Sequence, residues 1–199
     1  MRTSGILMPV FSLPSKYGIG CFSKEAYQFV DFLKESGQKN WQVLPLGQTS
    51  YGDSPYQSFS SFAGNPYFID LEQLLTQEEC DSFDFGKNPE SIDYAKLYQN
   101  RYKILRMACD RFLKQPSDDF FAFCQENDWW LGNYALFMVI KNMHKGASWL
   151  QWEEKYKRRD FAALDQVWHG QHDEIQFYQF QQYLFFCQWK KLHAYAAQA

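Results

Sequence analysis

The sequence predicts an α/β fold in which two parallel strands open the chain and a long, mostly helical region follows. Three observations carry this prediction: an apolar run over residues 6–11, an amphipathic pattern after Ser23, and a second apolar run over residues 40–46. A strand, a helix and a strand in this order form a βαβ unit with a right-handed crossover. Parallel strands are buried on both faces, which agrees with apolar residues at consecutive positions.

Each element of this unit has its own signal. Residues 6–11 and 40–46 are the expected strands. Ser23 is expected to cap the intervening helix, Glu25 complements the dipole of its first turn, and Gly37 ends it. The apolar face of this helix repeats at spacings of three and four residues through Ala26, Phe29, Val30 and Leu33.

Beyond residue 75 the sequence is typical of helices. Residues 81–91 read as a polar connector, and a stripe through Tyr98, Tyr102, Leu105, Cys109 and Phe112 predicts a helix that faces the core. A short helix is expected over 117–127, a buried one over 129–144 that includes Trp129 and Trp130, a polar break over 153–160, and a last helix from Asp173. Two strands do not make a stable sheet, and no Gly or Pro stops the last helix, so we expect a piece of a longer protein.

Composition excludes several classes of function. The chain has 199 residues, a net charge of −3 and a pI of about 5.8, without a basic block, so neither nucleic acid nor an anionic membrane surface is an expected partner. No secretory leader or stretch of membrane-spanning length is apparent. Five scattered cysteines without a CxxC pair indicate reduced thiols and a cytoplasmic protein. No metal or other cofactor is expected, because the four histidines lack a ligand spacing.

The most informative stretch is the loop over residues 47–67, directly after the second strand. It contains Tyr51-Gly52-Asp53-Ser54-Pro55-Tyr56-Gln57-Ser58 and Phe62-Ala63-Gly64-Asn65-Pro66-Tyr67. Aromatic rings suit the apolar face of a pyranose, and hydroxyl and amide groups suit its hydroxyls. A second loop, over residues 12–22, also follows a parallel strand, and function gathers at such strand ends.

Several motifs in order resemble one family. Ser12-Leu13-Pro14 with Tyr17-Gly18-Ile19-Gly20, then Trp41-Gln42-Val43-Leu44-Pro45-Leu46-Gly47, then the two motifs of the 47–67 loop, are similar to the start of the 4-alpha-glucanotransferases (amylomaltases or disproportionating enzymes) of the alpha-amylase clan. Later stretches also look familial, at Trp129-Trp130-Leu131, at 133–137 and at 183–189. Gln48 departs from the Pro that commonly follows Leu-Gly.

The resemblance implies the fold and organisation of a longer enzyme. Members have a (β/α)8 barrel with inserted helical subdomains, so this chain would hold the first two strands and a large insertion of an incomplete barrel. We expect residues 1–75 to start the barrel, 76–172 to form the helical insertion, and 173–199 to lead back to the barrel.

The resemblance also implies the reaction. The family transfers a 1,4-alpha-glucan segment to glucose or another 1,4-alpha-glucan with retention, which needs a nucleophile and an acid/base carboxyl about 5–5.5 Å apart. Those carboxylates lie on later strands of the family's barrel, so we assign no catalytic residue within this chain and expect it to be inactive alone. Two alternatives remain: a non-catalytic maltodextrin-binding module that folds by itself, or a hydrolase of the alpha-amylase clan.

Five residues of the 47–67 loop are the candidate substrate contacts. The resemblance implies that the Tyr56 ring stacks on the sugar beside the cleaved bond. Ser54 is expected to bond a glucose hydroxyl or serve the turn, and Asp53 to cap the turn or touch sugar. Tyr51 and Gln57 are weaker candidates, and Tyr98 is a remote platform for a longer glucan whose helical stripe favours the core.

Overall fold

The computed structural model describes residues 2–49, 53–86 and 90–199. The chain divides into two compact units, Met1–Lys114 with Leu184–Ala199, and Gln115–Tyr183. Both expected strands and the whole 47–67 loop belong to the first unit. Tyr51 lies outside the described residues.

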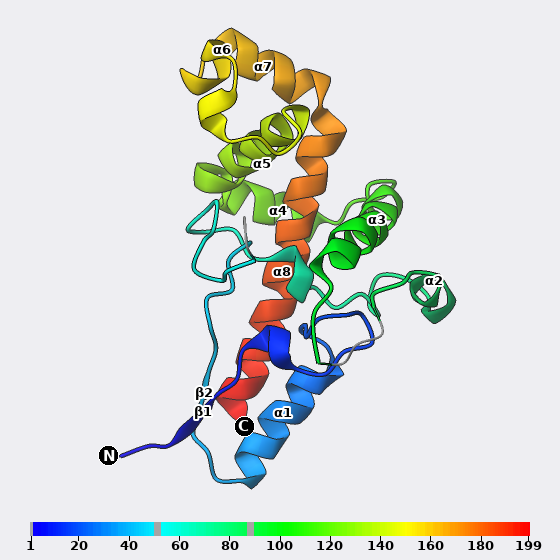
Figure 1. Ribbon diagram of the computed structural model, residues 1–199, viewed down its shortest axis with the longest axis vertical. Coiled ribbons are helices and arrows are strands. Elements are labelled where there is room, and N and C mark those ends of the chain that lie inside the picture. The colour runs from blue at the N-terminus through cyan, green and yellow to red at the C-terminus, as the bar shows by residue number, and fades with distance from the viewer. Residues whose placement is uncertain (1, 50–52, 87–89) are drawn as a thin grey trace. The chain divides into compact units, whose positions relative to one another are not determined.

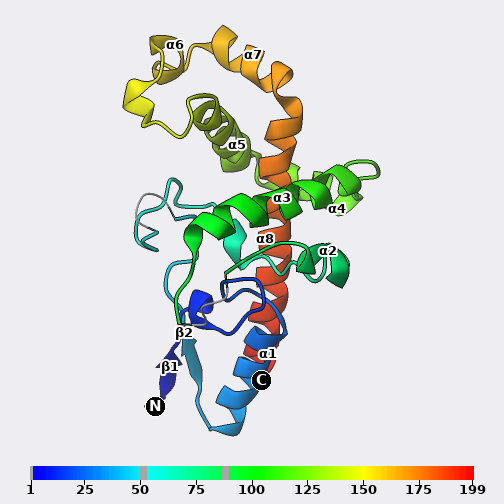
Figure 2. The ribbon, with the colours of Figure 1, turned by 45° about the vertical axis from the view of Figure 1, so that its right-hand side comes forward.

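The predicted βαβ unit is present. Strands β1 (Gly5–Leu7) and β2 (Asn40–Gln42) pair in parallel, with Gly5 opposite Asn40, and α1 (Lys24–Glu35) connects them. The two strands lie side by side in Figures 1 and 2. They are the only strands paired in a sheet among the described residues, which agrees with the expectation of an incomplete sheet.

Both strands are shorter than the sequence predicted, and prolines explain why. The ladder continues one bond past β1, where Met8 N donates to Gln42 O at 3.0 Å, and then meets Pro9, which has no N–H to donate. A 3₁₀ turn, η1 (Val10–Ser12), follows in place of the expected strand end. Pro45 similarly interrupts the run after β2.

Helix α1 behaves largely as its sequence predicts. Ser23 occupies the N-cap, but its hydroxyl donates to Glu25 Oε2 at 2.5 Å and does not bond the helix backbone. Gly37 has a φ of +69°, a left-handed conformation that ends the helix at little steric cost. The apolar face packs inward, while Asp31 accepts a hydrogen bond from Tyr195 Oη at 2.6 Å.

The rest of the first unit is built from short helical pieces and one long helix: η2 (Pro66–Phe68), α2 (Gln77–Asp81) and α3 (Tyr94–Phe112). Thr76 and Glu79 form a capping box that starts α2. The buried face of α3 includes Leu97, Ile104 and Leu105. Tyr98 is 64% exposed, so its expected place in a core stripe is wrong.

The second unit is helical. Its elements are α4 (Asp118–Glu126), α5 (Asp128–Met143), η3 (Trp149–Gln151), α6 (Glu154–Lys157), α7 (Phe161–Gly170) and the first part of α8 (His172–Gln198). The expected helices over 117–127 and 129–144 are confirmed. Trp130 is buried as expected, whereas Trp129 is 65% exposed, so its core assignment is wrong. The sequence interpretation also missed α7.

The last part of α8, residues 184–199, supplies core to the first unit. Phe22 contacts the rings of Phe68, Phe185 and Trp189, with centroids 5.2–5.9 Å apart. Gln188 joins this helix to the segment after η2, because its Oε1 accepts from Asp70 N at 2.7 Å and its Nε2 donates to Asp70 O at 3.2 Å. No helix within the described ranges is both long and apolar enough to cross a membrane.

The contact between Gly64 and Phe185 gives a test of this packing. A Cβ on Gly64 would lie 2.2 Å from the buried Phe185 ring, so we expect Gly64→Ala to lower the free energy of unfolding by about 1–3 kcal/mol through overpacking. Urea unfolding would measure the loss. Gly170→Ala is the control, because nothing lies within 4 Å of its added Cβ; equal losses in both variants would contradict this account.

Candidate functional site

The 47–67 loop is held at both of its ends. Isolated antiparallel bridges join Gly47 to Gly64 and Thr49 to Ser58, and Asn65 N donates to Leu46 O at 2.8 Å. The Asn65 side chain then accepts from Tyr67 N at 3.0 Å and caps η2. Asn65 and Pro66 therefore start a turn. The two ends of the loop are therefore held together by backbone hydrogen bonds, at the point where the chain leaves the strand region and returns to the core.

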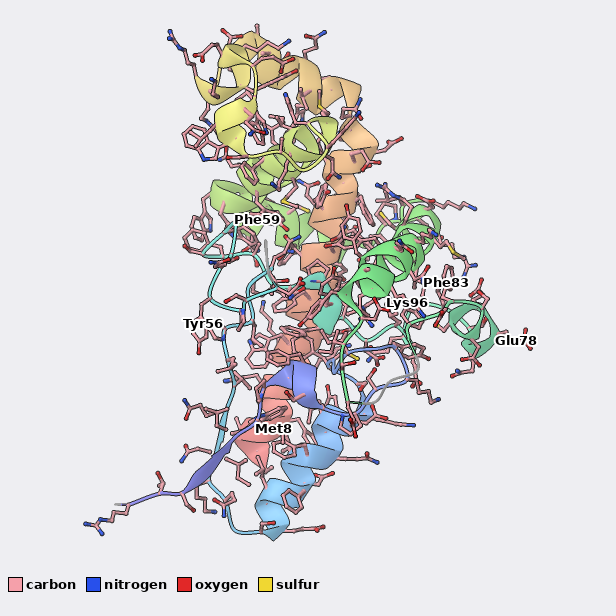
Figure 3. The ribbon with its side chains drawn as sticks, in the orientation of Figure 1. Met8, Tyr56, Phe59, Glu78, Phe83 and Lys96 are labelled. Carbon is pink, nitrogen blue, oxygen red and sulfur yellow. The ribbon has the colours of Figure 1, made fainter. Side chains whose placement is uncertain are left out.

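Tyr56 projects from the loop (Figure 3). Its side chain is 72% exposed, and the neighbouring Gln57 is also exposed. An exposed ring on a loop anchored at both ends can take a sugar face without displacing core side chains. The arrangement is the opposite of a tyrosine packed among buried aliphatic residues.

Ser54 serves the turn that presents this ring. Its Oγ accepts from Tyr56 N at 3.3 Å, and its carbonyl accepts from Gln57 N at 3.1 Å. A hydroxyl that accepts one backbone bond keeps its own proton for another acceptor. Ser54 can therefore hold the turn and donate to a sugar hydroxyl at the same time.

Asp53 does not cap the turn as its sequence context suggested. A side chain in this position commonly bonds the N–H two residues on, but that residue is Pro55, which has none. The Asp53 carboxylate makes no hydrogen bond to another described residue. Its backbone has a φ of +53°, a left-handed conformation that Asp and Asn tolerate better than most residues.

Asp53 is one of the residues that line a narrow crevice at the strand ends. The crevice has a volume of only about 10 Å³, room for about one water molecule. Phe11, Ile19 and Tyr94 line it together with Pro55 and Asp53. Burial raises the pKa of Asp53, and no second carboxylate contributes to that shift. Asp53 therefore lacks the partner that a retaining double displacement requires.

A group of tyrosines adjoins the loop. Tyr94, Tyr98 and Tyr102 follow one another at four-residue spacing on α3, and the Tyr67 ring lies 6.3 Å from that of Tyr94 and 6.0 Å from that of Tyr102. Burial, reinforced by the negative charge of Asp53, raises the pKa of Tyr67 and Tyr94. Their hydroxyls therefore stay protonated and can donate.

Gln48 ties this group to the loop. Its side chain is buried, and its Nε2 donates to Tyr102 Oη at 3.3 Å. Gln48 stands where the resemblance led us to expect a Pro. In the structure this residue also forms a side-chain link between the loop and α3.

A buried arginine holds the 12–22 loop and the segment after the 47–67 loop in position, and the sequence interpretation missed it. Arg101 on α3 is fully buried, and its guanidinium donates to Tyr17 O at 3.4 Å and to Ile69 O at 2.5 Å. One side chain thus links the 12–22 loop and the segment after the 47–67 loop. The signal in the sequence was a cation on the apolar face of α3, between Leu97 and Ile104.

Metal chemistry has no visible site in this part of the protein. Within residues 2–49, 53–86 and 90–199, no three His, Cys, Asp or Glu side chains are grouped so as to hold a metal ion. All five cysteines are free thiols.

Comparison with known proteins identifies a family whose sequences this chain matches. The family described as 4-alpha-glucanotransferase matches residues 8–199. The 4-alpha-glucanotransferase of Clostridium butyricum is 44% identical over 95% of this chain, and that of Thermus thermophilus is 43% identical over 98%. The chain spans about 40% of the length of each relative.

Solved structures give the same result. An amylomaltase from Streptococcus agalactiae in complex with acarbose superposes with a TM-score of 0.96 and 40% identity, over the whole chain and 41% of that protein. An amylomaltase from Corynebacterium glutamicum, at 17% identity and a TM-score of 0.68, covers 98% of this chain and 28% of its own, and shows the fold alone. The predicted fold, an incomplete barrel with a helical insertion, is confirmed.

Two carboxylates in the first unit should give opposite responses to pH. Because burial raises the pKa of Asp53 above 3.8, the stability linked to its proton is present below that pH and lost as pH rises through the folded-state pKa. We expect Asp53→Asn to be more stable than the parent at pH 7, and the difference to shrink as pH falls through the folded-state pKa and to vanish below about pH 3.8.

Glu79→Gln is the opposite case. Hydrogen bonds from Arg111 lower the pKa of Glu79 to about 2, so its contribution is present above 4.5 and lost as pH falls. This variant should be less stable than the parent at pH 7, and the difference should disappear only below about pH 2. Urea unfolding across this range measures both; parallel pH dependence in the two variants would contradict the assignment.

Proposed function

Because this chain belongs to the 4-alpha-glucanotransferase family, we propose that it is the donor-side part of an enzyme that moves a 1,4-alpha-glucan segment onto glucose or another 1,4-alpha-glucan. The single observation that carries the proposal is the exposed Tyr56 on a loop closed by the Gly47–Gly64 bridge. The partners are maltodextrins and glucose. The scattered free cysteines support a cytoplasmic location.

Retention would follow from a double displacement. In the first step one carboxylate attacks the anomeric carbon, and the leaving oxygen takes a proton from the acid/base carboxyl group. In the second step the acceptor hydroxyl attacks the anomeric carbon and displaces the nucleophile. The acceptor hydroxyl gives its proton to the acid/base carboxylate, which restores the acid. We propose that both carboxyl groups belong to the part of the enzyme outside these residues. In the same scheme residues 1–75 begin the barrel, 76–172 form its insertion and 173–199 return to it.

Within this scheme the loop residues bind substrate. The Tyr56 ring stacks on a glucose unit, Ser54 Oγ donates to one of its hydroxyls, and Gln57 offers an exposed amide. The Asp53 carboxylate accepts from a sugar hydroxyl at the crevice. Tyr51 keeps the weaker role expected from the sequence, and Tyr98 offers an exposed ring for a longer glucan.

The chain alone should not catalyse transfer, because the carboxylate pair is missing. Incubated with maltotriose, the 199-residue protein is expected to release no glucose and to form no longer maltodextrins, as followed by chromatography of the products. Turnover above background would refute this. Release of glucose without longer products would instead favour a hydrolase.

Tyr56 should matter for binding through its ring. We expect Tyr56→Ala to weaken maltodextrin binding about tenfold, close to 1.4 kcal/mol, and Tyr56→Phe to retain most of the affinity. Isothermal titration calorimetry with maltose and maltoheptaose measures both. A matched control is Phe32→Ala, which removes an exposed ring from α1, away from the loop. Unchanged affinity in Tyr56→Ala would exclude the stacking role.

A further inference from the structure

Gln48 is a buried polar residue in the first arm of the 47–67 loop, the short segment that leads from the strand region into the loop. It lies between Gly47 and Thr49, the two residues whose antiparallel bridges close the loop. Its side chain is only 6% exposed, whereas residues 56–59 of the same loop are exposed. Burial of an amide costs free energy unless the amide is hydrogen-bonded. A glutamine buried at this position therefore needs a partner on a neighbouring element.

Helix α3 supplies this partner. Gln48 Nε2 donates to Tyr102 Oη at 3.3 Å. Arg101, the residue before Tyr102, is fully buried and donates to two backbone carbonyls of the core. The Tyr102 ring also lies 6.0 Å from the ring of Tyr67 and 5.5 Å from that of Tyr98. The bond therefore attaches the first arm of the loop to a side chain that the surrounding structure holds in place.

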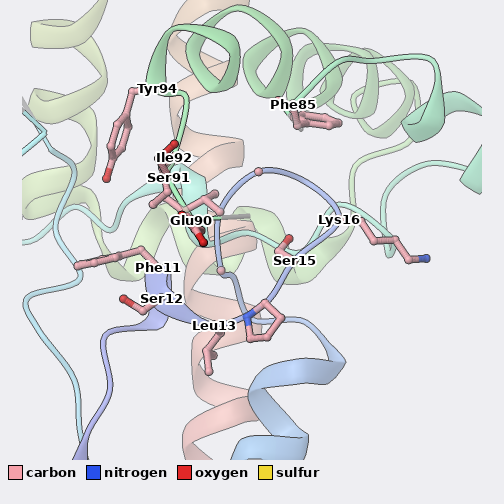
Figure 4. A pocket seen from close by; sticks show the side chains of 15 residues that line it. Phe11, Ser12, Leu13, Ser15, Lys16, Phe85, Glu90, Ser91, Ile92 and Tyr94 are labelled. Atoms are coloured by element: carbon pink, nitrogen blue, oxygen red, sulfur yellow. The ribbon is translucent and has the colours of Figure 1, made fainter. Parts of the chain in front are cut away.

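The start of α3 lies along the same loop. Tyr94, in the first turn of this helix, lines the narrow crevice together with Asp53 and Pro55. Its ring, which also lines a pocket of about 750 Å³, extends from the start of the helix (Figure 4). The first turns of α3 thus face the loop, and the hydrogen bond of Gln48 attaches the first arm of the loop to them.

Several hydrogen bonds further along the loop join residues that are close in sequence. Ser54 Oγ accepts from Tyr56 N at 3.3 Å. Ser58 Oγ donates to Ser60 O at 2.8 Å, and Ser60 Oγ accepts from Phe62 N at 3.1 Å. Such bonds give the loop its internal shape, but they do not fix its direction, because both partners move with the loop. A bond to a helix fixes the direction as well.

We propose that Gln48 is a positioning residue for sugar binding. Through Tyr102 it holds the first arm of the loop against α3, so that the exposed Tyr56 ring keeps one orientation before a glucan arrives. A loop that spends only a fraction of its time in the binding orientation has its affinity reduced by that fraction. This inference rests on the proposed function, and it adds the residue that keeps the loop ready to bind.

A double-mutant cycle in the 199-residue chain tests the role of this bond. Gln48→Met keeps the length of the side chain without its amide, and Tyr102→Phe keeps the ring without its hydroxyl. By calorimetry with maltoheptaose, we expect each change to weaken binding about fivefold, the effect of losing one neutral hydrogen bond. The double variant should also bind about fivefold more weakly, because both changes break the same bond. Losses that multiply to about 25-fold would overturn the proposal.

Tyr195→Phe is the matched control. It also removes a tyrosine hydroxyl from a side-chain hydrogen bond, because Tyr195 Oη on α8 donates to Asp31 on α1 at 2.6 Å, away from the loop. This variant should lower the free energy of unfolding in urea and leave the affinity for maltoheptaose unchanged. If Gln48→Met behaves in the same way and loses stability without losing affinity, Gln48 has a purely structural role and the proposal is refuted.

A spectroscopic measurement separates this proposal from the proposed function. Relaxation dispersion of amide nitrogens reports motion on the microsecond-to-millisecond timescale. We expect Gln48→Met to add such motion at Tyr56 and Gln57 and not at the buried Ile104 of α3. Unchanged relaxation at Tyr56 and Gln57 would overturn the positioning role even if the chain binds sugar. If the parent chain does not bind maltoheptaose, the proposed function fails, and the relaxation data still decide whether Gln48 orders the loop.

Discussion

A single buried guanidinium organises the part of the molecule that carries the proposed sites. Arg101 enters the core from α3 and reaches two backbone carbonyls, one from each side of the loop system. Burial lowers the pKa of this group, and the thiol of Cys21 and the carboxylate of Asp70 oppose that effect. Removing a charge from water costs free energy that only good hydrogen bonds offset. The loops are therefore held to α3 by an interaction that tolerates little displacement.

The opening of the fold could be predicted because its signals are local. The Ser23 cap, the apolar repeat of α1 and the left-handed Gly37 each specify structure within a few residues, and the βαβ unit follows from them. The predicted strands were too long because the prediction followed the apolar residues. It did not take into account that Pro9 and Pro45 have no backbone N–H to donate to a neighbouring strand. Helix α7 was missed because the polar break before it hid the cap at Asp160, whose side chain accepts from Ala163 N at 2.9 Å.

The candidate site could be predicted in part. The 47–67 loop could be singled out from the sequence, because rings and hydroxyls in a turn-rich segment predict a sugar site, and that role stays a prediction. The exposure of individual side chains could not be predicted. Tyr98 and Trp129 belong to helical patterns that suggest a core position, yet both are exposed. Which face of a helix remains exposed depends on how the other elements pack. The position of Arg101, and the pocket lined by residues within 11–20, 85–86 and 90–94, depend on contacts between distant segments, which no local pattern contains.

The bond between Asp70 and Gln188 joins residues 118 positions apart. The Phe185 ring also lies against Gly64. The end of the 47–67 loop and the segment that follows it therefore pack on the last part of α8. During synthesis, α1 and the strands can form early, because their contacts are local. Because residues 184–199 are synthesised last among these elements, the loop cannot complete this packing until they have left the ribosome.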